Sequence, residues 1–108
     1  MDFEVAVEEF EDDRQFLMEV LEGFLDNVRV QIETMRHAIS DGDAQAVRKE
    51  AHSIKGGAAN LTADKLSSIA LELENIGKSG PLQGGIGCLE RLEKEFSRLE
   101  DYVRNLGI

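Results

Sequence analysis

Residues 47–61 read VRKEAHSIKGGAANL and contain the most informative pattern in the chain. Small and aliphatic residues recur in it at alternating steps of three and four, the spacing of one face of an α-helix. The members of this apolar seam are Val47, Ala51, Ile54, Ala58 and Leu61. At about 100° per residue, His52 lies about 130° from the mean direction of the seam. The pattern predicts a helix that buries its seam and carries His52 on an accessible face.

Three further segments show the same helical spacing of apolar residues. Their members are Leu17, Leu21, Phe24, Val28, Met35 and Ile39 in the first, Leu66, Ile69, Ala70, Leu73 and Ile76 in the second, and Leu89, Leu92, Phe96, Leu99, Val103 and Leu106 in the third. Asp41-Gly42-Asp43 interrupts the pattern once, and the glycine-rich residues 77–87 interrupt it again. We predict helices over residues 3–10, 13–40, 43–60, 63–78 and 84–106.

None of the four long helices can bury its stripe alone, and most connections between them are short. We therefore expect an all-α fold, an antiparallel up-down four-helix bundle with a short extra N-terminal helix that covers one end. Residues 1–108 are expected to form a single domain. Since one bundle can bury every stripe, we also expect a monomer.

Polar residues near the expected helix starts suggest caps. Asp12, with Gln15 three positions later, resembles a capping box. Either Asp41 or Asp43 can cap the next helix, and Thr62 marks the expected start of the one after it.

The composition excludes several classes of partner. The chain of 108 residues has 22 acidic and 12 basic side chains, a formal net charge of −10, which repels nucleic acid and anionic membranes. No apolar run approaches the roughly 20 residues that cross a bilayer, and the acidic N-terminus lacks a secretory pattern. The single Cys88 cannot form an internal disulfide, which fits a reducing compartment. The expected location is the cytoplasm.

Positive charge gathers around His52 despite the acidic composition. Arg48, His52, Lys55 and Ala59 form one stripe because residues three and four apart are neighbours on a helix. Lys49 and Gly56 flank that stripe on its outer side. Two adjacent glycines, Gly56 and Gly57, each cost about 1 kcal/mol relative to Ala inside an exposed helix. Our hypothesis is that the missing side chains let a bulky group or another backbone approach His52 closely.

The chemistry of this stripe suits phosphoryl transfer. Near neutral pH an exposed imidazole is largely uncharged, so one ring nitrogen of His52 has a free lone pair for attack on phosphorus. Lys55 can place positive charge near the phosphoryl oxygens. The chain lacks a nucleotide-binding loop and a cluster of aspartates at ligand spacing. We expect no cofactor and no metal site, including one shared between His52 and His37; the magnesium must come from a partner.

Residues 51–61, AHSIKGGAANL, resemble the signature of histidine-containing phosphotransfer (HPt) domains, A-H-x-[LI]-K-G-[SG]-[SA]-x-N-[LIF]. Leu66 to Leu73-Glu74 and Phe24 also resemble family positions, so the similarity covers most of the chain. It implies a four-helix bundle with the motif on the second long helix. Thr62 departs from the pattern, because many members have glycine just past that helix.

The resemblance implies a role for each matching residue. His52 would be phosphorylated at its outer ring nitrogen, Lys55 would be the charge partner, and Gly56 would give clearance to an incoming domain. Donors and acceptors would be response-regulator receiver domains carrying aspartyl phosphate, or a sensor kinase in cis or trans. We expect Arg48, Lys49 and Ala59 to contribute to receiver docking.

Two other functions compete with a phosphorelay intermediate. A helical bundle could bind a signalling partner without being phosphorylated, although a binding-only module does not need a nucleophile. A self-contained kinase or phosphatase is disfavoured by the missing nucleotide and metal motifs. The expected function is that of a phosphorylated carrier and not an enzyme.

Overall fold

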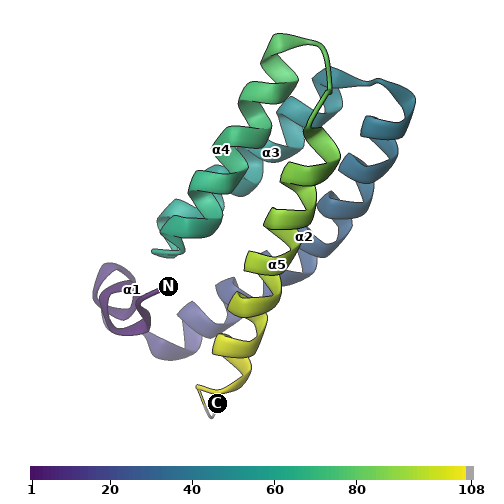
Figure 1. Cartoon of the computed structure of the whole chain (residues 1–108). Helices are drawn as coiled ribbons and strands as arrows, with labels where there is room; N and C mark the ends of the chain where they lie inside the picture. Colours follow the sequence, from purple (N-terminus) through teal and green to yellow (C-terminus); the bar gives the residue numbers. More distant parts are fainter. Residues whose placement is uncertain (107–108) are drawn as a thin grey trace.

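The computed structural model describes residues 1–106 and consists of helices joined by short connections (Figure 1). In chain order the helices are α1 (Phe3–Glu9), α2 (Arg14–Asp41), α3 (Ala44–Asn60), α4 (Asp64–Ser79) and α5 (Gly85–Arg104). No β-strand occurs in this part of the chain. The long helices alternate in direction, and α2 packs on α3, α3 on α4, α4 on α5 and α5 on α2. The predicted all-α antiparallel four-helix bundle with a short N-terminal helix is confirmed.

Every helix end lies within two residues of its predicted position. The largest difference is at the C-terminus of α5, which was predicted at residue 106 and is observed at Arg104. The predicted single domain extends to residues 107 and 108, which lie outside the described residues. Its status as one domain stays a prediction.

The apolar seams form one core. On α3 the seam residues are fully or almost fully buried, and the stripes of the other long helices meet them. The half-buried members of the predicted stripes are Phe24, Ile39, Ile76 and Leu106, which lie at the rim and pack against the core. The buried seam directs the opposite face of α3 toward solvent.

The helix starts correct one prediction about caps and decide between two alternatives for another. α2 is capped by Asp13, whose carboxylate accepts a hydrogen bond from the backbone N–H of Phe16 at 3.0 Å. Asp12, the predicted cap, has a φ of 62° and belongs to the preceding turn. Of the two candidates for α3, Asp43 is the cap and accepts from the N–H of Ala46. Each cap lies at the last residue before helical dihedrals begin.

Thr62 forms a turn that joins three helices. Its φ is 60°, a left-handed conformation that β-branched residues rarely adopt. The N–H of Thr62 bonds to the carbonyl of Ala59, and the N–H of Ala63 bonds to that of Ala58, as in a Schellman motif. The Thr62 hydroxyl accepts from the N–H of Asp2 at 2.8 Å and donates to its carbonyl at 3.1 Å. Thr62 therefore ties α1 to the α3–α4 end and does not cap α4, whose N-cap is Ala63.

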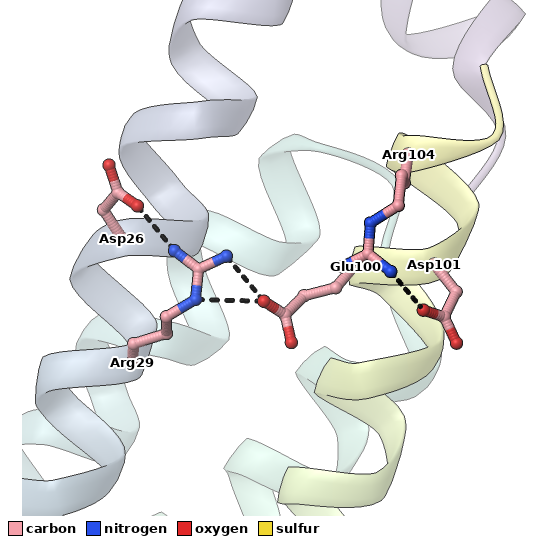
Figure 2. A network of polar contacts seen from close by, with 5 residues as sticks. All are labelled: Asp26, Arg29, Glu100, Asp101 and Arg104. Carbon is pink, nitrogen blue, oxygen red and sulfur yellow. Dashed lines mark hydrogen bonds and ion pairs between the residues drawn. The ribbon is translucent and has the colours of Figure 1, made fainter. Parts of the chain in front are cut away.

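Ion pairs connect the long helices on the side where α2 meets α5 (Figure 2). Arg29 of α2 donates through Nε to Glu100 of α5 at 3.0 Å and also bonds to Asp26. Arg36 makes a similar pair with Glu93. These pairs are partly exposed to solvent, so each stabilises the fold only modestly. Their main consequence is that these arginines are already occupied by carboxylates.

Gly77 allows α3 and α4 to approach closely. A Cβ atom at this position would lie 2.7 Å from the backbone nitrogen of Arg48 and 2.9 Å from the carbonyl oxygen of Ala44. Both contacts are with backbone, which cannot move aside as a flexible side chain can. The absence of a side chain at Gly77 therefore sets the separation of the two helices that carry the candidate site.

This geometry predicts opposite effects of the same substitution at two glycines. Gly77→Ala should lower the free energy of unfolding by about 1–3 kcal/mol, because its methyl group overlaps α3. Gly56→Ala should raise it by up to about 1 kcal/mol, because nothing lies within 4 Å of the added methyl group and alanine favours helix. Urea unfolding followed by circular dichroism measures both, with Gly23→Ala as a second open position. A Gly77→Ala protein as stable as the wild type would contradict the close approach.

Candidate functional site

His52 lies on the outer face of α3. Its side chain is 68% exposed, while the seam residues on either side of it, Ala51 and Ile54, are completely buried. The helical seam thus holds the imidazole at the surface, as the sequence predicted. One ring nitrogen is nevertheless held by a neighbouring helix.

Glu74 of α4 lies beneath the imidazole. It is 2% exposed and is the one buried charged residue in the described part of the chain. Its Oε2 atom is 2.7 Å from His52 Nδ1, and its Oε1 atom accepts a hydrogen bond from Lys55 Nζ at 2.6 Å. Lys78, one turn further along α4, places Nζ 3.8 Å from Oε2. His52, Lys55 and Lys78 therefore all contact the same carboxylate.

These contacts determine the charge of Glu74 and the tautomer of His52. The hydrogen bond from Lys55 is the largest influence on the pKa of Glu74 and lowers it, against the opposing effect of burial. The hydrogen bond from His52 and the positive charges of Lys55 and Lys78 act in the same direction, and together these contacts lower the pKa of Glu74 from 4.5 to about 2. At neutral pH the carboxylate is ionised and can only accept. In the neutral imidazole of His52, Nδ1 must therefore carry the proton, which leaves the lone pair on Nε2.

A hollow of about 410 Å³ lies beside the imidazole. Its lining residues are Gln45, Arg48, Lys49, His52, Glu74 and Lys78. The cations come from both helices, two from α3 and one from α4. The lining of the hollow therefore carries three basic side chains and one carboxylate.

Two of the basic side chains near His52 are also unusual in lacking carboxylate partners. Within residues 1–106, every Lys and Arg except Arg48, Lys49 and Lys94 forms an ion pair with a carboxylate. Two of these three line the hollow. In a chain with 22 acidic residues, this leaves positive charge available beside His52.

The structure divides the predicted site residues into two groups. Arg48 and Lys49 line the hollow together with His52. Gly56 and Ala59, which follow His52 on α3, are exposed but do not line the hollow. Lys55 is 29% exposed and is directed at Glu74. The roles of these residues in docking and phosphoryl stabilisation stay predictions.

The two adjacent glycines serve different purposes. A Cβ at Gly56 would meet nothing within 4 Å, so this position is open to an approaching group, as the hypothesis required. A Cβ at Gly57 would lie 2.6 Å from Cε1 of Phe24. The bulky group at Gly57 is thus this chain's own α2 side chain, and for Gly57 the docking hypothesis is wrong.

The sequence prediction assigned no role to three residues of the site: Glu74, Lys78 and Gln45. A signal for Glu74 was present, because it is four residues after Ala70 and next to Leu73 in the inward stripe of α4. A carboxylate on a buried face requires a partner. Lys78 lies four residues further on, on the same face.

Comparison with known proteins identifies the class of protein. Residues 19–102 match the family model described as the Hpt domain, so the chain belongs to the Hpt domain family. Members of this family are phosphocarriers that work with receiver domains and kinases, and the chain has a histidine phosphotransfer role in a phosphorelay.

A solved structure agrees with this assignment. The chain is similar to the crystal structure of histidine-containing phosphotransfer protein B (HptB) from Pseudomonas aeruginosa PAO1, with a TM-score of 0.89 and 30% sequence identity. The match covers 97% of this chain and 91% of the other. A comparison with curated proteins gave no significant match. Among residues 1–106, no helix has the length and apolar character needed to span a membrane.

The lowered pKa of Glu74 predicts a specific pH dependence of stability. A carboxyl group with a depressed folded pKa stabilises the fold above its unfolded pKa, and this stabilisation is lost as pH falls through the folded value. The wild type should therefore exceed Glu74→Gln in free energy of unfolding by the largest amount near neutral pH. This difference should shrink as the pH falls from about 4.5 to about 2. Urea unfolding of both proteins across this range measures the difference. A constant difference would mean that Glu74 is not held ionised by its partners.

Proposed function

We propose that Nε2 of His52 accepts a phosphoryl group from a receiver-domain aspartate and passes it to another receiver domain. The observation that carries this proposal is the contact of His52 Nδ1 with the ionised carboxylate of Glu74. The contact directs the reactive lone pair outward to Nε2. It does so on a side chain that is 68% exposed and therefore accessible to another protein.

The transfer step needs no proton movement at His52. The Nε2 lone pair attacks phosphorus and forms an N–P bond, while the P–O bond to the aspartyl carboxylate breaks and its electron pair leaves with the carboxylate. The imidazole, which keeps its Nδ1 proton, becomes positively charged. Glu74 Oε2, 2.7 Å from Nδ1, offsets that charge as it develops. Attack by the aspartate of a second receiver reverses the same steps.

Lys55 contributes to this step through Glu74. The predicted contact of Lys55 with the phosphoryl oxygens stays a prediction, whereas its hydrogen bond to Glu74 keeps the carboxylate ionised. In this proposal Glu74 and Lys55 are positioning residues, and His52 is the residue that touches the phosphoryl group.

The partner completes the chemistry. We propose that the chain itself holds no nucleotide, metal or other cofactor, has no catalytic activity of its own, and meets a receiver domain that supplies magnesium and the aspartate. Donors would be a receiver, free or within a hybrid sensor kinase, or a kinase directly. Open space at Gly56 and Ala59 and the unpaired Arg48 and Lys49 would accommodate an acidic receiver surface. A monomer in the cytoplasm fits this role.

A phosphotransfer assay tests the proposal. Incubation with a phosphorylated receiver and magnesium should label the wild type with acid-labile, base-stable phosphate, and His52→Gln should abolish the label. The matched control is His37→Gln, because His37 is the chain's other histidine and is also exposed. Label that persists in His52→Gln would contradict the assignment of the site. Binding of several receivers without label would favour a non-phosphorylated interaction module.

A further inference from the structure

Two lysines contact one carboxylate at the site, and their contacts differ in kind. Lys55 donates a hydrogen bond to Glu74 Oε1 at 2.6 Å, and its side chain is 29% exposed. Lys78 Nζ lies 3.8 Å from Oε2, beyond hydrogen-bond distance, and its side chain is 52% exposed. Lys55 is therefore hydrogen-bonded to Glu74, whereas Lys78 forms only a longer, more exposed ion pair with it.

We propose that Lys78, in place of the Lys55 predicted from the sequence, is the lysine that binds the phosphoryl oxygens on His52, while Lys55 stays on Glu74. This inference rests on the proposed function and deepens it by dividing the work between the two lysines. Lys78 would turn its ammonium group from Glu74 into the hollow when a phosphoryl group arrives on Nε2.

The free energy needed to move each lysine away from Glu74 supports this division of roles. Removing Lys55 from Glu74 would break a charge-assisted hydrogen bond to a buried carboxylate, which is strongly unfavourable. Removing Lys78 would break a half-exposed ion pair, which contributes little in water. Glu74 would keep its hydrogen bonds from His52 and Lys55. Only Lys78 can leave without uncovering the buried charge.

Helix direction also favours Lys78. Side chains lean toward the N-terminus of their own helix. On α3 this lean carries His52 toward Arg48 and Gln45, and on the antiparallel α4 it carries Lys78 back toward Glu74. His52 and Lys78 therefore converge from opposite helices, and both line the hollow. Lys55, which follows His52 on α3, does not line it.

The other two cations of the hollow are placed differently. Arg48 and Lys49 precede His52 on the same helix, so both side chains lean in the same direction as the imidazole and away from its base. Neither forms an ion pair within residues 1–106. They are suited to meeting an acidic partner at the rim. Lys78 is the cation that approaches across the helix interface.

The test uses a small phosphoryl donor beside the protein donor. With phosphoramidate, the P–N bond of the donor breaks, its nitrogen leaves as ammonia, and the N–P bond to His52 Nε2 forms. Lys78→Gln should slow labelling about tenfold, the effect of losing one charge-assisted hydrogen bond, with both phosphoramidate and a phosphorylated receiver. Lys78→Arg should restore most of the rate. Lys94→Gln, which removes an unpaired lysine outside the hollow, should match the wild type.

The outcomes separate this inference from the proposed function. A labelled wild type with an equally fast Lys78→Gln would overturn the role of Lys78 and leave the role of His52 intact. Slowing with the receiver alone would overturn it too, because Lys78 would then act in docking. A wild type that neither donor labels would overturn both proposals. Urea unfolding of Lys78→Gln checks that the slower labelling does not come from a loss of folded protein.

Discussion

The buried carboxylate of Glu74 is the constraint on which the rest of the site depends. An ionised group removed from water is strongly destabilising unless charges and hydrogen bonds replace its hydration. α3 supplies both hydrogen bonds, from Lys55 to one oxygen and from His52 to the other. Because both donors come from one helix and the acceptor from the next, satisfying Glu74 also fixes how α3 and α4 align. The same contacts prepare the imidazole for reaction.

Packing brings these groups into contact. Gly77 lets the backbones of α3 and α4 approach closely near Arg48, and Gly57 makes room for the ring of Phe24 from α2. α3 is thus held from two sides while its outer face stays open at Gly56. The basic hollow beside His52, set in an acidic molecule, would orient such encounters by charge.

The helices were predicted well because apolar residues recur at a regular spacing along each one. The seam of Val47, Ala51, Ile54 and Ala58 also gave the outward direction of His52 from a single helix. Contacts between helices could not be predicted in the same way, because spacing along one helix does not specify its neighbour. For that reason the pairing of Lys55 with Glu74 was missed.

The two central glycines illustrate the same limit. Gly56 and Gly57 are adjacent in sequence and carry the same helix penalty, so both received the same docking hypothesis. Only the position of Phe24 on α2 distinguishes them. At the start of α2 the predicted cap was wrong by one residue, Asp12 in place of Asp13. Capping depends on backbone dihedral angles, which the sequence only suggests. Thr62 departed from the expected glycine because its hydroxyl binds Asp2, a contact 60 residues away in sequence.

The tautomer of His52 is the most direct test of whether Glu74 directs the nucleophile. Nitrogen-15 NMR of the histidine side chains at neutral pH distinguishes a ring protonated at Nδ1 from one protonated at Nε2. The neutral His52 ring should carry its proton on Nδ1, with His37 as an exposed reference in the same spectrum. A neutral His52 ring protonated mainly at Nε2 would contradict the geometry, because its lone pair would then face Glu74 and not the receiver.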